Sequence, residues 1–270
     1  MNCKLCGSSK VSGHFKVKGY EVFKCLDCGL MSLGGLSIDS GKLYSEPYFN
    51  GEVYNDYINE MGSNKAEFRT RLKLVNGILP SRGKLLEIGC AAGFFLKTAK
   101  DDGWDVKGIE VSEYAADFGR ARLGLDIVCG DIDSLEPGHE QFDAVVMWDV
   151  IEHIKDPFGL IRKVRPMLRP GGALFVSTGD TDGLNARIFG KDWFLLEPPY
   201  HLWYFSRRNF RAFLERNGYK VKSCSLDGNL LDNGPRNAGS PFKLIKKSGA
   251  NRVFSRFNIG NVFYMAAEKT

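Results

Sequence analysis

The chain has 270 residues, of which 43% are hydrophobic and 26% are charged, and its formal net charge is +5 at pH 7. This length and composition are typical of a globular protein with one large domain and a small additional module. The excess of positive charge is mild, so we interpret it as a solvated basic face and not as a surface that binds an anionic partner. No apolar run approaches about 18 residues and no signal-peptide pattern is present, so we expect a cytoplasmic protein without a membrane partner.

Four of the seven cysteines form two matched pairs near the N-terminus, in the pattern C-x2-C-x18-C-x2-C. This spacing is typical of a structural zinc site closed by four thiolates. Disulfides or a redox pair are the alternatives, but a reducing compartment and the equal spacing of the pairs disfavour them. With short strands expected at Ser12–Val17 and Gly19–Lys24, residues 1–32 are predicted to form a zinc ribbon. Its ligands would be Cys3, Cys6, Cys25 and Cys28.

Residues 33–80 are predicted to be a linker followed by a helical segment, because Val53–Leu79 has helical periodicity. This region is dense in aromatic side chains. We expect most of them to pack against the following domain, while one or two can close over a ligand as a lid. They are Tyr44, Tyr48, Phe49, Tyr54 and Tyr57.

Strands and helices alternate through the rest of the chain, residues 81–270. This alternation predicts an α/β domain with a doubly wound, mostly parallel sheet. The expected strands are Leu85–Ile88, Val106–Glu110, Asp126–Cys129, Phe142–Trp148, Ala173–Thr178, Tyr219–Ser225 and Val262–Ala267. The expected helices are Phe95–Lys100, Glu113–Leu123, Pro157–Leu168 and Phe205–Asn217, with a turn at Arg169–Gly172 before the fifth strand.

The first of these strands ends in a glycine-containing turn. Gly89 and Gly93 allow the backbone to turn sharply and to approach a ligand closely. The glycine spacing of a dinucleotide-binding turn is absent, and Glu87 would be badly placed beside a pyrophosphate. The turn therefore favours a ligand that carries a cationic amino group and no phosphate.

Acidic residues end three successive strands, so their carboxylates are expected along one edge of the sheet. Glu110 follows the second strand and is placed to accept hydrogen bonds from both hydroxyls of a ribose. Asp131, with Ile132, is placed to hold an adenine. Each acid alone is better explained as a helix cap than as a ligand contact, but three at consecutive strand ends, including Glu87, indicate a ligand site.

From about Tyr44 to the C-terminus, the sequence resembles the class I S-adenosylmethionine-dependent methyltransferases. The resemblance rests on Leu85–Gly93, Gly108–Glu110, Gly130–Asp131, Phe142–Ile154 and Leu168–Gly172. It implies a Rossmann-like fold and S-adenosylmethionine as cofactor. The residues that it implies for cofactor binding are Glu87, Gly89, Cys90, Ala91, Gly93, Phe94, Glu110, Val111, Asp131, Ile132, Trp148 and Asp149, with Ala91 standing where the family has a glycine.

Three further segments are similar to a bacterial branch of this family that modifies sugars, lipids or natural products: Ser177–Thr178, Asp192–Trp193 and His201–Ser206. Several members of that wider group have an N-terminal four-cysteine zinc module. The resemblance implies a small-molecule acceptor, such as a sugar nucleotide, a glycan or a natural-product intermediate. Two alternatives remain open: an RNA methyltransferase that binds RNA through the ribbon, and a binding protein without activity. The ribbon has no concentrated Lys/Arg stripe, so no nucleic-acid partner is expected.

Two histidines are candidates for the general base, His201 and His153. His153 follows the fourth strand, and His201 lies in an aromatic segment after the fifth. In an alternative reading, Asp149, Glu152 and His153 resemble the metal-binding residues of ubiquinone-pathway O-methyltransferases. The sequence leaves the acceptor atom and the oligomeric state undetermined.

Overall fold

The computed structural model describes residues 1–34, 65–135, 141–226 and 260–270. The chain divides into two compact units. Unit 1 consists of Met1–Leu36, Asp149–Phe158 and Val176–Ala267, and unit 2 of Ser37–Trp148, Gly159–Phe175 and Glu268–Thr270. The predicted limits of the ribbon, the linker and the large domain stay a prediction.

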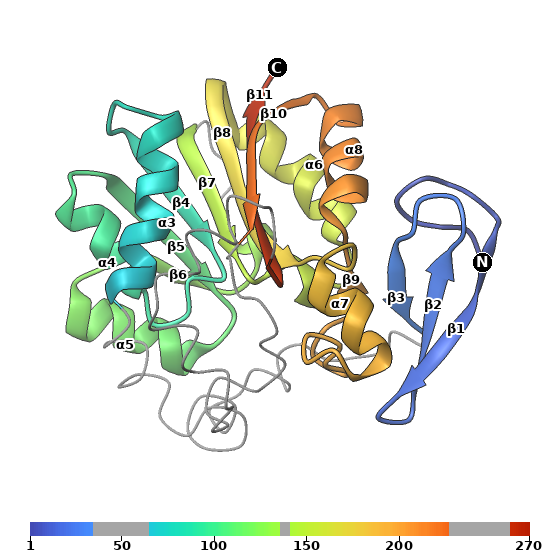
Figure 1. The fold of residues 1–270 in the computed structure, drawn as a ribbon. Helices are drawn as coiled ribbons and strands as arrows, with labels where there is room; N and C mark the ends of the chain where they lie inside the picture. The colour runs from blue at the N-terminus through green and yellow to red at the C-terminus, as the bar shows by residue number, and fades with distance from the viewer. Residues whose placement is uncertain (35–64, 136–140, 227–259) are drawn as a thin grey trace, which may run out of the picture. The chain divides into compact units, whose positions relative to one another are not determined.

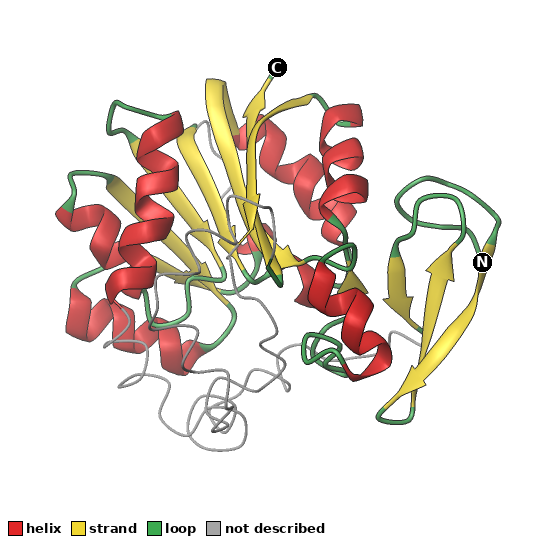
Figure 2. Cartoon of the chain, viewed as in Figure 1, coloured by secondary structure: helices red, strands yellow, loops and turns green. Residues whose placement is uncertain are grey.

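Unit 2 contains strands that alternate with helices along the chain, as Figures 1 and 2 show. Its strands are β4 (Lys84–Ile88), β5 (Asp105–Glu110), β6 (Ile127–Cys129) and β7 (Phe142–Trp148). Its helices are α3 (Lys65–Ile78), α4 (Phe94–Asp101), α5 (Glu113–Leu123) and most of α6 (Pro157–Met167).

The pairs β4–β7, β4–β5 and β5–β6 are parallel. Ile88 pairs with Ile109, and Glu110 pairs with Cys129, so the carboxyl ends of β4, β5 and β6 meet at one edge of the sheet. The full strand order of the seven-stranded sheet is β10-β11-β8-β7-β4-β5-β6. The predicted fold class, a Rossmann-like and mostly parallel α/β sheet, is confirmed.

Local sequence explains why several of these elements have the predicted bounds. All seven residues of β7 are buried, which accounts for an apolar strand interrupted only by Asp143, whose Oδ2 accepts a hydrogen bond from the Lys84 N–H at 2.7 Å. Helix α5 begins after Ser112, whose hydroxyl accepts a hydrogen bond from the Ala115 N–H. It ends at Gly124, which adopts a left-handed conformation with φ of 63°. Both signals are local, so the sequence predicted α5 residue for residue.

Strand β8 (Leu168–Gly179) differs from the prediction because it begins five residues before Ala173. The expected turn at Arg169–Gly172 lies inside this strand. Gly171 has a φ of +76°, and a side chain at Gly172 would lie 3.0 Å from the carbonyl oxygens of Arg169 and Phe142. The glycines therefore let the backbone bend and approach its neighbours closely without leaving the strand.

Unit 1 contains a four-stranded sheet with the order β1-β2-β3-β9. Strands β1 (Val11–Val17) and β2 (Tyr20–Cys25) form the predicted hairpin, closed by two residues with positive φ, Lys18 and Gly19. Strand β3 (Met31–Leu33) pairs with β2 and with β9 (Trp203–Tyr204), both antiparallel. The short strands β3 and β9 were not predicted.

The remaining elements of unit 1 include helices α7 (Leu184–Phe189) and α8 (Arg207–Arg216) and strands β10 (Tyr219–Leu226) and β11 (Val262–Lys269), the last two residues of which belong to unit 2. Helix α8 confirms the helix predicted at Phe205–Asn217, but it begins after the cap Ser206. Six aromatic side chains from several segments of unit 1 form an aromatic core, with neighbouring ring centroids 5.1–6.5 Å apart. They are Phe158, Trp203, Phe205, Phe210, Phe213 and Phe263.

The described part of the predicted helical segment is α3, while the residues before Lys65 lie outside the described ranges. The aromatic residues considered for a lid lie there too: Tyr44, Tyr48, Phe49, Tyr54 and Tyr57. Within the four described ranges, no helix is both long and apolar enough to cross a membrane.

Candidate active site

In unit 2, the turn between β4 and α4 is built from residues that the sequence placed there. The N–H groups of Gly89 and Cys90 both donate to the carbonyl oxygen of Ile109 on β5, at 2.8 and 3.1 Å. Gly89 and Gly93 have φ values of +70° and +82°, and a side chain at Gly93 would lie only 2.5 Å from Leu125. Glycine is therefore required at position 93 both by backbone conformation and by space.

Glu110 at the end of β5 braces this turn. Its Oε2 accepts a hydrogen bond from the Ala91 N–H at 2.8 Å, and its Oε1 accepts one from the Ser112 N–H at 2.9 Å. Ala91 has a φ of 48°, a strained value for alanine that this hydrogen bond helps to hold. Burial raises the pKa of Glu110, although backbone hydrogen bonds oppose the rise. The N–H groups of Ala91, Ser112 and Val111 all act on this carboxylate, whose four lone pairs leave acceptor capacity for a ligand hydroxyl.

Glu87 lies one residue before the end of β4 and exposes 4% of its surface. Its Oε2 has no hydrogen-bond partner among the described residues. Burial raises the pKa of this carboxyl well above its usual range, and the charge of Glu110 adds to the rise, while Arg71 opposes it. A buried acceptor without a donor is costly, so this oxygen fits a ligand that brings a cationic donor.

Arg71 on α3 is a component of this site that sequence reasoning missed. It exposes 6% of its surface, pairs with Glu67 at 2.6 Å, and lies 5.4 Å from the centre of the Trp148 ring. The signal was available, because Arg71 follows Phe68 by three positions and therefore shares the buried face of a helix. A buried arginine on such a face indicates a charged partner.

The other predicted cofactor residues of unit 2 lie around the same strand ends. Asp131 is exposed and caps the 3₁₀ turn Ile132–Ser134. This is the capping role that the sequence offered as the alternative to a ligand contact. Phe94 begins α4, and Val111 follows β5 with 42% of its surface exposed. Trp148 ends β7 and packs edge-on against Phe95.

In unit 1, Asp149 is held by Ser177 rather than by a metal-binding arrangement. Its N–H lies 3.0 Å from the Ser177 hydroxyl oxygen, and that hydroxyl donates to Asp149 Oδ1 at 2.9 Å. Asp149 has a φ of 56°, a left-handed value that the two-way contact stabilises. The charge of Asp149 still acts on His153, whose pKa it raises against the effect of burial.

The two candidate bases, His153 and His201, lie against each other, with ring centroids 4.7 Å apart and planes at 80°. His153 Nδ1 lies 2.9 Å from the carbonyl oxygen of Tyr200, and His201 Nδ1 lies 2.7 Å from that of Leu195. A carbonyl oxygen only accepts, so Nδ1 carries the proton in both rings and Nε2 keeps a lone pair. Both side chains can therefore act as bases or ligands through Nε2.

Burial lowers the pKa of both histidines, so both rings are neutral at pH 7. For His153, burial and the neighbouring His201 lower the pKa to about 3. For His201, the Leu195 carbonyl and the charges of Glu197 and Asp149 oppose the effect of burial. A neutral ring is the form in which a histidine accepts a proton as a general base.

Glu152 joins this pair to form a group with metal-binding potential. One ligand atom from each of Glu152, His153 and His201 lies within 4.8 Å of the others. Histidine ligands of metals commonly donate their second ring N–H to a carbonyl, as both rings do here. The group can hold a proton, a polar ligand or a divalent cation. His201, and not Asp149, is the third member.

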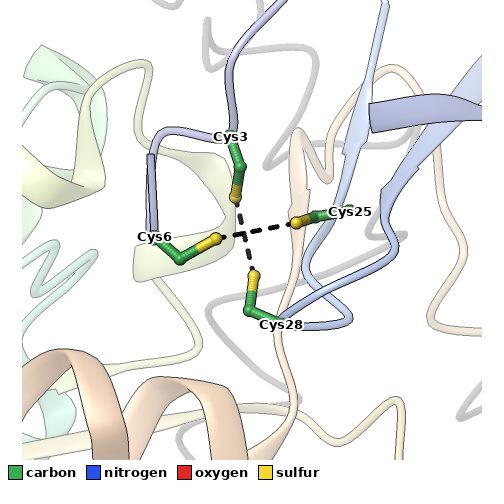
Figure 3. Close-up of side chains that lie close together, drawn as sticks. All are labelled: Cys3, Cys6, Cys25 and Cys28. Atoms are coloured by element: carbon green, nitrogen blue, oxygen red, sulfur yellow. Dashed lines mark hydrogen bonds between the residues drawn. The ribbon is translucent and has the colours of Figure 1, made fainter. Parts of the chain in front are cut away.

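The four N-terminal cysteines converge on one point, as Figure 3 shows. The Cys3 and Cys28 sulfurs lie 3.6 Å apart, as do those of Cys6 and Cys25. A tetrahedral zinc site with Zn–S bonds of about 2.3 Å requires sulfurs about 3.8 Å apart, whereas a disulfide requires about 2 Å. All four cysteines are free, so the arrangement fits zinc and not disulfides.

The pKa values of three of these thiols shift in different directions: burial raises those of Cys3 and Cys28, whereas that of Cys25 is lowered. Burial would raise the pKa of this thiol, but hydrogen bonds from the backbone N–H groups of Cys28 and Asp27 outweigh it and lower the pKa to about 7. A thiolate is the form that binds zinc. The glycines that follow each pair, Gly7 and Gly29, have φ values of +79° and +76°, which these tight turns need.

Comparison with known proteins identifies the larger part of the chain. A family model described as "Methyltransferase domain" matches residues 58–223, more than half of the sequence. The chain is similar to the ubiquinone biosynthesis O-methyltransferase of Coxiella burnetii (strain Dugway 5J108-111), with 30% identity over 114 residues. That match covers 40% of this chain and 49% of the relative, so the chain spans about half the length of the curated relatives it matches.

Solved structures share the fold at low sequence identity. An S-adenosylmethionine-dependent methyltransferase from Archaeoglobus fulgidus superposes with a TM-score of 0.56 at 18% identity, over 76% of this chain and 95% of that one. The geranyl diphosphate C-methyltransferase of Streptomyces coelicolor, in complex with S-adenosyl-L-homocysteine, has a TM-score of 0.54 at 17% identity, over 75% and 79%. The chain therefore belongs to the methyltransferase domain family, and it has the fold of the S-adenosylmethionine-dependent methyltransferases.

Proposed function

We propose that this methyltransferase transfers the methyl group of S-adenosylmethionine to a small-molecule acceptor. The names of two of the compared proteins, a ubiquinone biosynthesis O-methyltransferase and a geranyl diphosphate C-methyltransferase, support an acceptor of this size. The four-cysteine module and the segment His201–Ser206 favour a sugar nucleotide, a glycan or a natural-product intermediate. The cofactor supplies an activated methyl group on its sulfonium. The protein therefore has to bind the cofactor, orient the acceptor toward the methyl group and remove a proton from the acceptor.

The observation that carries this proposal is the buried, unpartnered Oε2 of Glu87 beside the Gly89–Gly93 turn. The amino group of S-adenosylmethionine is a cationic donor of the kind that this oxygen lacks. When it binds, the attraction lowers the pKa of Glu87 toward its usual range, which makes the carboxyl an anion. Glu110 would accept hydrogen bonds from the ribose hydroxyls, and Asp131 would face the adenine.

His201 is the proposed general base. Its Nε2 would take the proton from the acceptor as the acceptor atom attacks the methyl carbon, and the sulfonium leaves as a neutral thioether. The resulting imidazolium keeps its Nδ1–H bond to the Leu195 carbonyl and is stabilised by Glu197 and Asp149. His153, whose pKa burial and the neighbouring His201 lower to about 3, would stay neutral beside it.

The four cysteines are proposed to bind one structural zinc ion, with no position left open for a substrate. The convergence of the four sulfurs supports this assignment. A module whose strands have three to seven residues has too little apolar core to fold by burial alone, so the metal would supply the missing stability.

The test of the proposed function has two parts. Calorimetric titration should show binding of S-adenosylmethionine and no binding of NAD. Incubation of the protein with methyl-labelled cofactor and a metabolite extract should then transfer the label to a compound of low molecular mass, which mass spectrometry identifies. Tight NAD binding without binding of the methyl donor contradicts the cofactor, and transfer of the label only to RNA contradicts the acceptor class.

A further inference from the structure

We propose that the four-cysteine module is a positioning element: through strand pairing it holds the segment that carries His201, so that bound zinc orders the histidine pair. The module is Met1–Gly34, and the segment is His201–Phe205. The proposal rests on the zinc site proposed above, and all of its contacts lie within unit 1.

The first contact is the pairing of β3 with β9. Met31 pairs with Tyr204 and Ser32 pairs with Trp203, although about 170 residues of sequence separate them. The ladder extends one step toward the histidine, because the Leu33 N–H donates to the Leu202 carbonyl at 3.0 Å. Figure 1 shows the two short strands side by side. The residue directly after His201 is therefore hydrogen-bonded to the module.

The second contact fixes the other edge of the same segment. The Leu202 N–H donates to the carbonyl oxygen of Glu152 at 2.8 Å, and the Trp203 indole N–H donates to that of Ile154 at 2.9 Å. These two acceptors flank His153. The segment is thus held between the module on one side and the residues that carry Glu152 and His153 on the other, which sets the spacing of the two imidazole rings.

The third contact joins the metal-binding turn itself to α8. The side-chain Nδ2 of Asn209 donates to the carbonyl oxygen of Cys28 at 3.4 Å. The Oδ1 of the same side chain accepts from the Ser206 N–H at 3.0 Å, which completes the capping box at the start of α8. A buried amide, 3% exposed, therefore connects one proposed zinc ligand to the helix that follows His201–Phe205.

The consequence follows from how small metal modules fold. Without zinc, four thiolates or thiols no longer share a centre, and a module of this size loses its structure. Strand β9, with only two residues, would then lose its partner strand and the hydrogen bond at Leu202. The turn at Gly89–Gly93 belongs to unit 2 and makes its contacts there, so it should keep its structure.

Hydrogen exchange on the full-length protein tests this coupling, before and after zinc is removed by a chelator and its loss is verified by elemental analysis. Backbone exchange in His201–Phe205 should accelerate about ten-fold or more, while exchange in Leu85–Gly93 should change less than about two-fold. In protein labelled with ¹⁵N-histidine, His153 and His201 should each show a protonated Nδ1 and an unprotonated Nε2 with zinc, and should lose this pattern without it.

A matched pair of variants tests the contact at Cys28 without a chelator. Asn209→Asp keeps the oxygen that caps α8 but replaces the donor to Cys28 by an acceptor. Asn217→Asp makes the same change at the other end of α8, where Nδ2 donates to Phe213 and not to the module. Zinc-loaded Asn209→Asp should exchange at least about three-fold faster than wild type in His201–Phe205, and Asn217→Asp should match wild type.

Unchanged exchange and unchanged histidine signals after complete loss of zinc would overturn the proposal, as would a protein that contains no metal at the cysteines. Equal acceleration in both segments would also overturn it, because zinc would then stabilise the whole fold. If Asn209→Asp does not fold, the measurements on wild type still decide. Failure of zinc-loaded protein to bind S-adenosylmethionine would contradict the proposed function alone, because neither measurement requires the cofactor.

Discussion

Replacement of Glu110 by alanine should weaken S-adenosylmethionine binding by two separable routes. The first is the loss of two hydrogen bonds to the ribose, together worth about 2–4 kcal/mol, or an affinity loss of about 30- to 1000-fold. The second is the loss of the brace, because the N–H groups of Ala91 and Ser112 would lose their acceptors at 2.8 and 2.9 Å. Each orphaned N–H costs about 1–3 kcal/mol, so the variant should also be less stable.

The two routes are separated by a cofactor analogue without ribose hydroxyls. Wild type should bind S-adenosylhomocysteine about 30- to 1000-fold more tightly than its 2′,3′-dideoxy form, whereas Glu110→Ala should bind both with nearly equal affinity. Glu113→Ala, an exposed acid at the start of α5, is the control and should behave as wild type. Calorimetry that finds the same preference for the hydroxyls in Glu110→Ala and wild type would refute the ribose assignment.

Three further predictions concern unit 1. Purified protein should contain one zinc ion per chain by elemental analysis, and Cys25→Ser should lose it; full zinc content in that variant would contradict the four-thiolate site. His201→Asn should lower turnover about 100-fold or more and leave the affinity for S-adenosylmethionine nearly intact, whereas His153→Asn should keep more activity; the reverse order would assign the base to His153. Burial lowers the pKa of His153 from 6.5 to about 3, so between these pH values the ring is protonated in the unfolded chain and neutral in the folded one. The free energy of unfolding is therefore highest above about pH 6.5, and it falls by about 1.4 kcal/mol per pH unit as the pH drops toward 3. Urea unfolding between pH 4.5 and 7 should therefore show a shallower pH dependence for His153→Asn than for wild type, and parallel curves would contradict the buried neutral histidine.

The parallel strands and the candidate cofactor residues were predictable because their signals are local. An apolar run interrupted only by Asp143 predicts β7, and a serine cap with a terminal glycine predicts α5. The position of Glu110 at the end of β5 follows from the length of the strand, and parallel pairing then brings it to the same edge as the end of β4. What Glu110 does in that position, bracing Ala91 and Ser112, depended on the path of the turn and was not predictable.

The sequence by itself determined the kind of fold and the chemical types at the site: four thiols at zinc spacing, glycines in the first turn, acids at strand ends and two histidines. Each is read from a local pattern, such as a C-x2-C pair or the last residue of one strand, where periodicity, capping and side-chain chemistry act. Only the tertiary structure decided that His153 and His201 share one protonation pattern, that Arg71 lies beside Trp148, and that β3 pairs with β9. These contacts join segments tens to hundreds of residues apart. A two-residue strand such as Trp203–Tyr204 has no periodicity of its own, so its structure comes from the partner against which it packs.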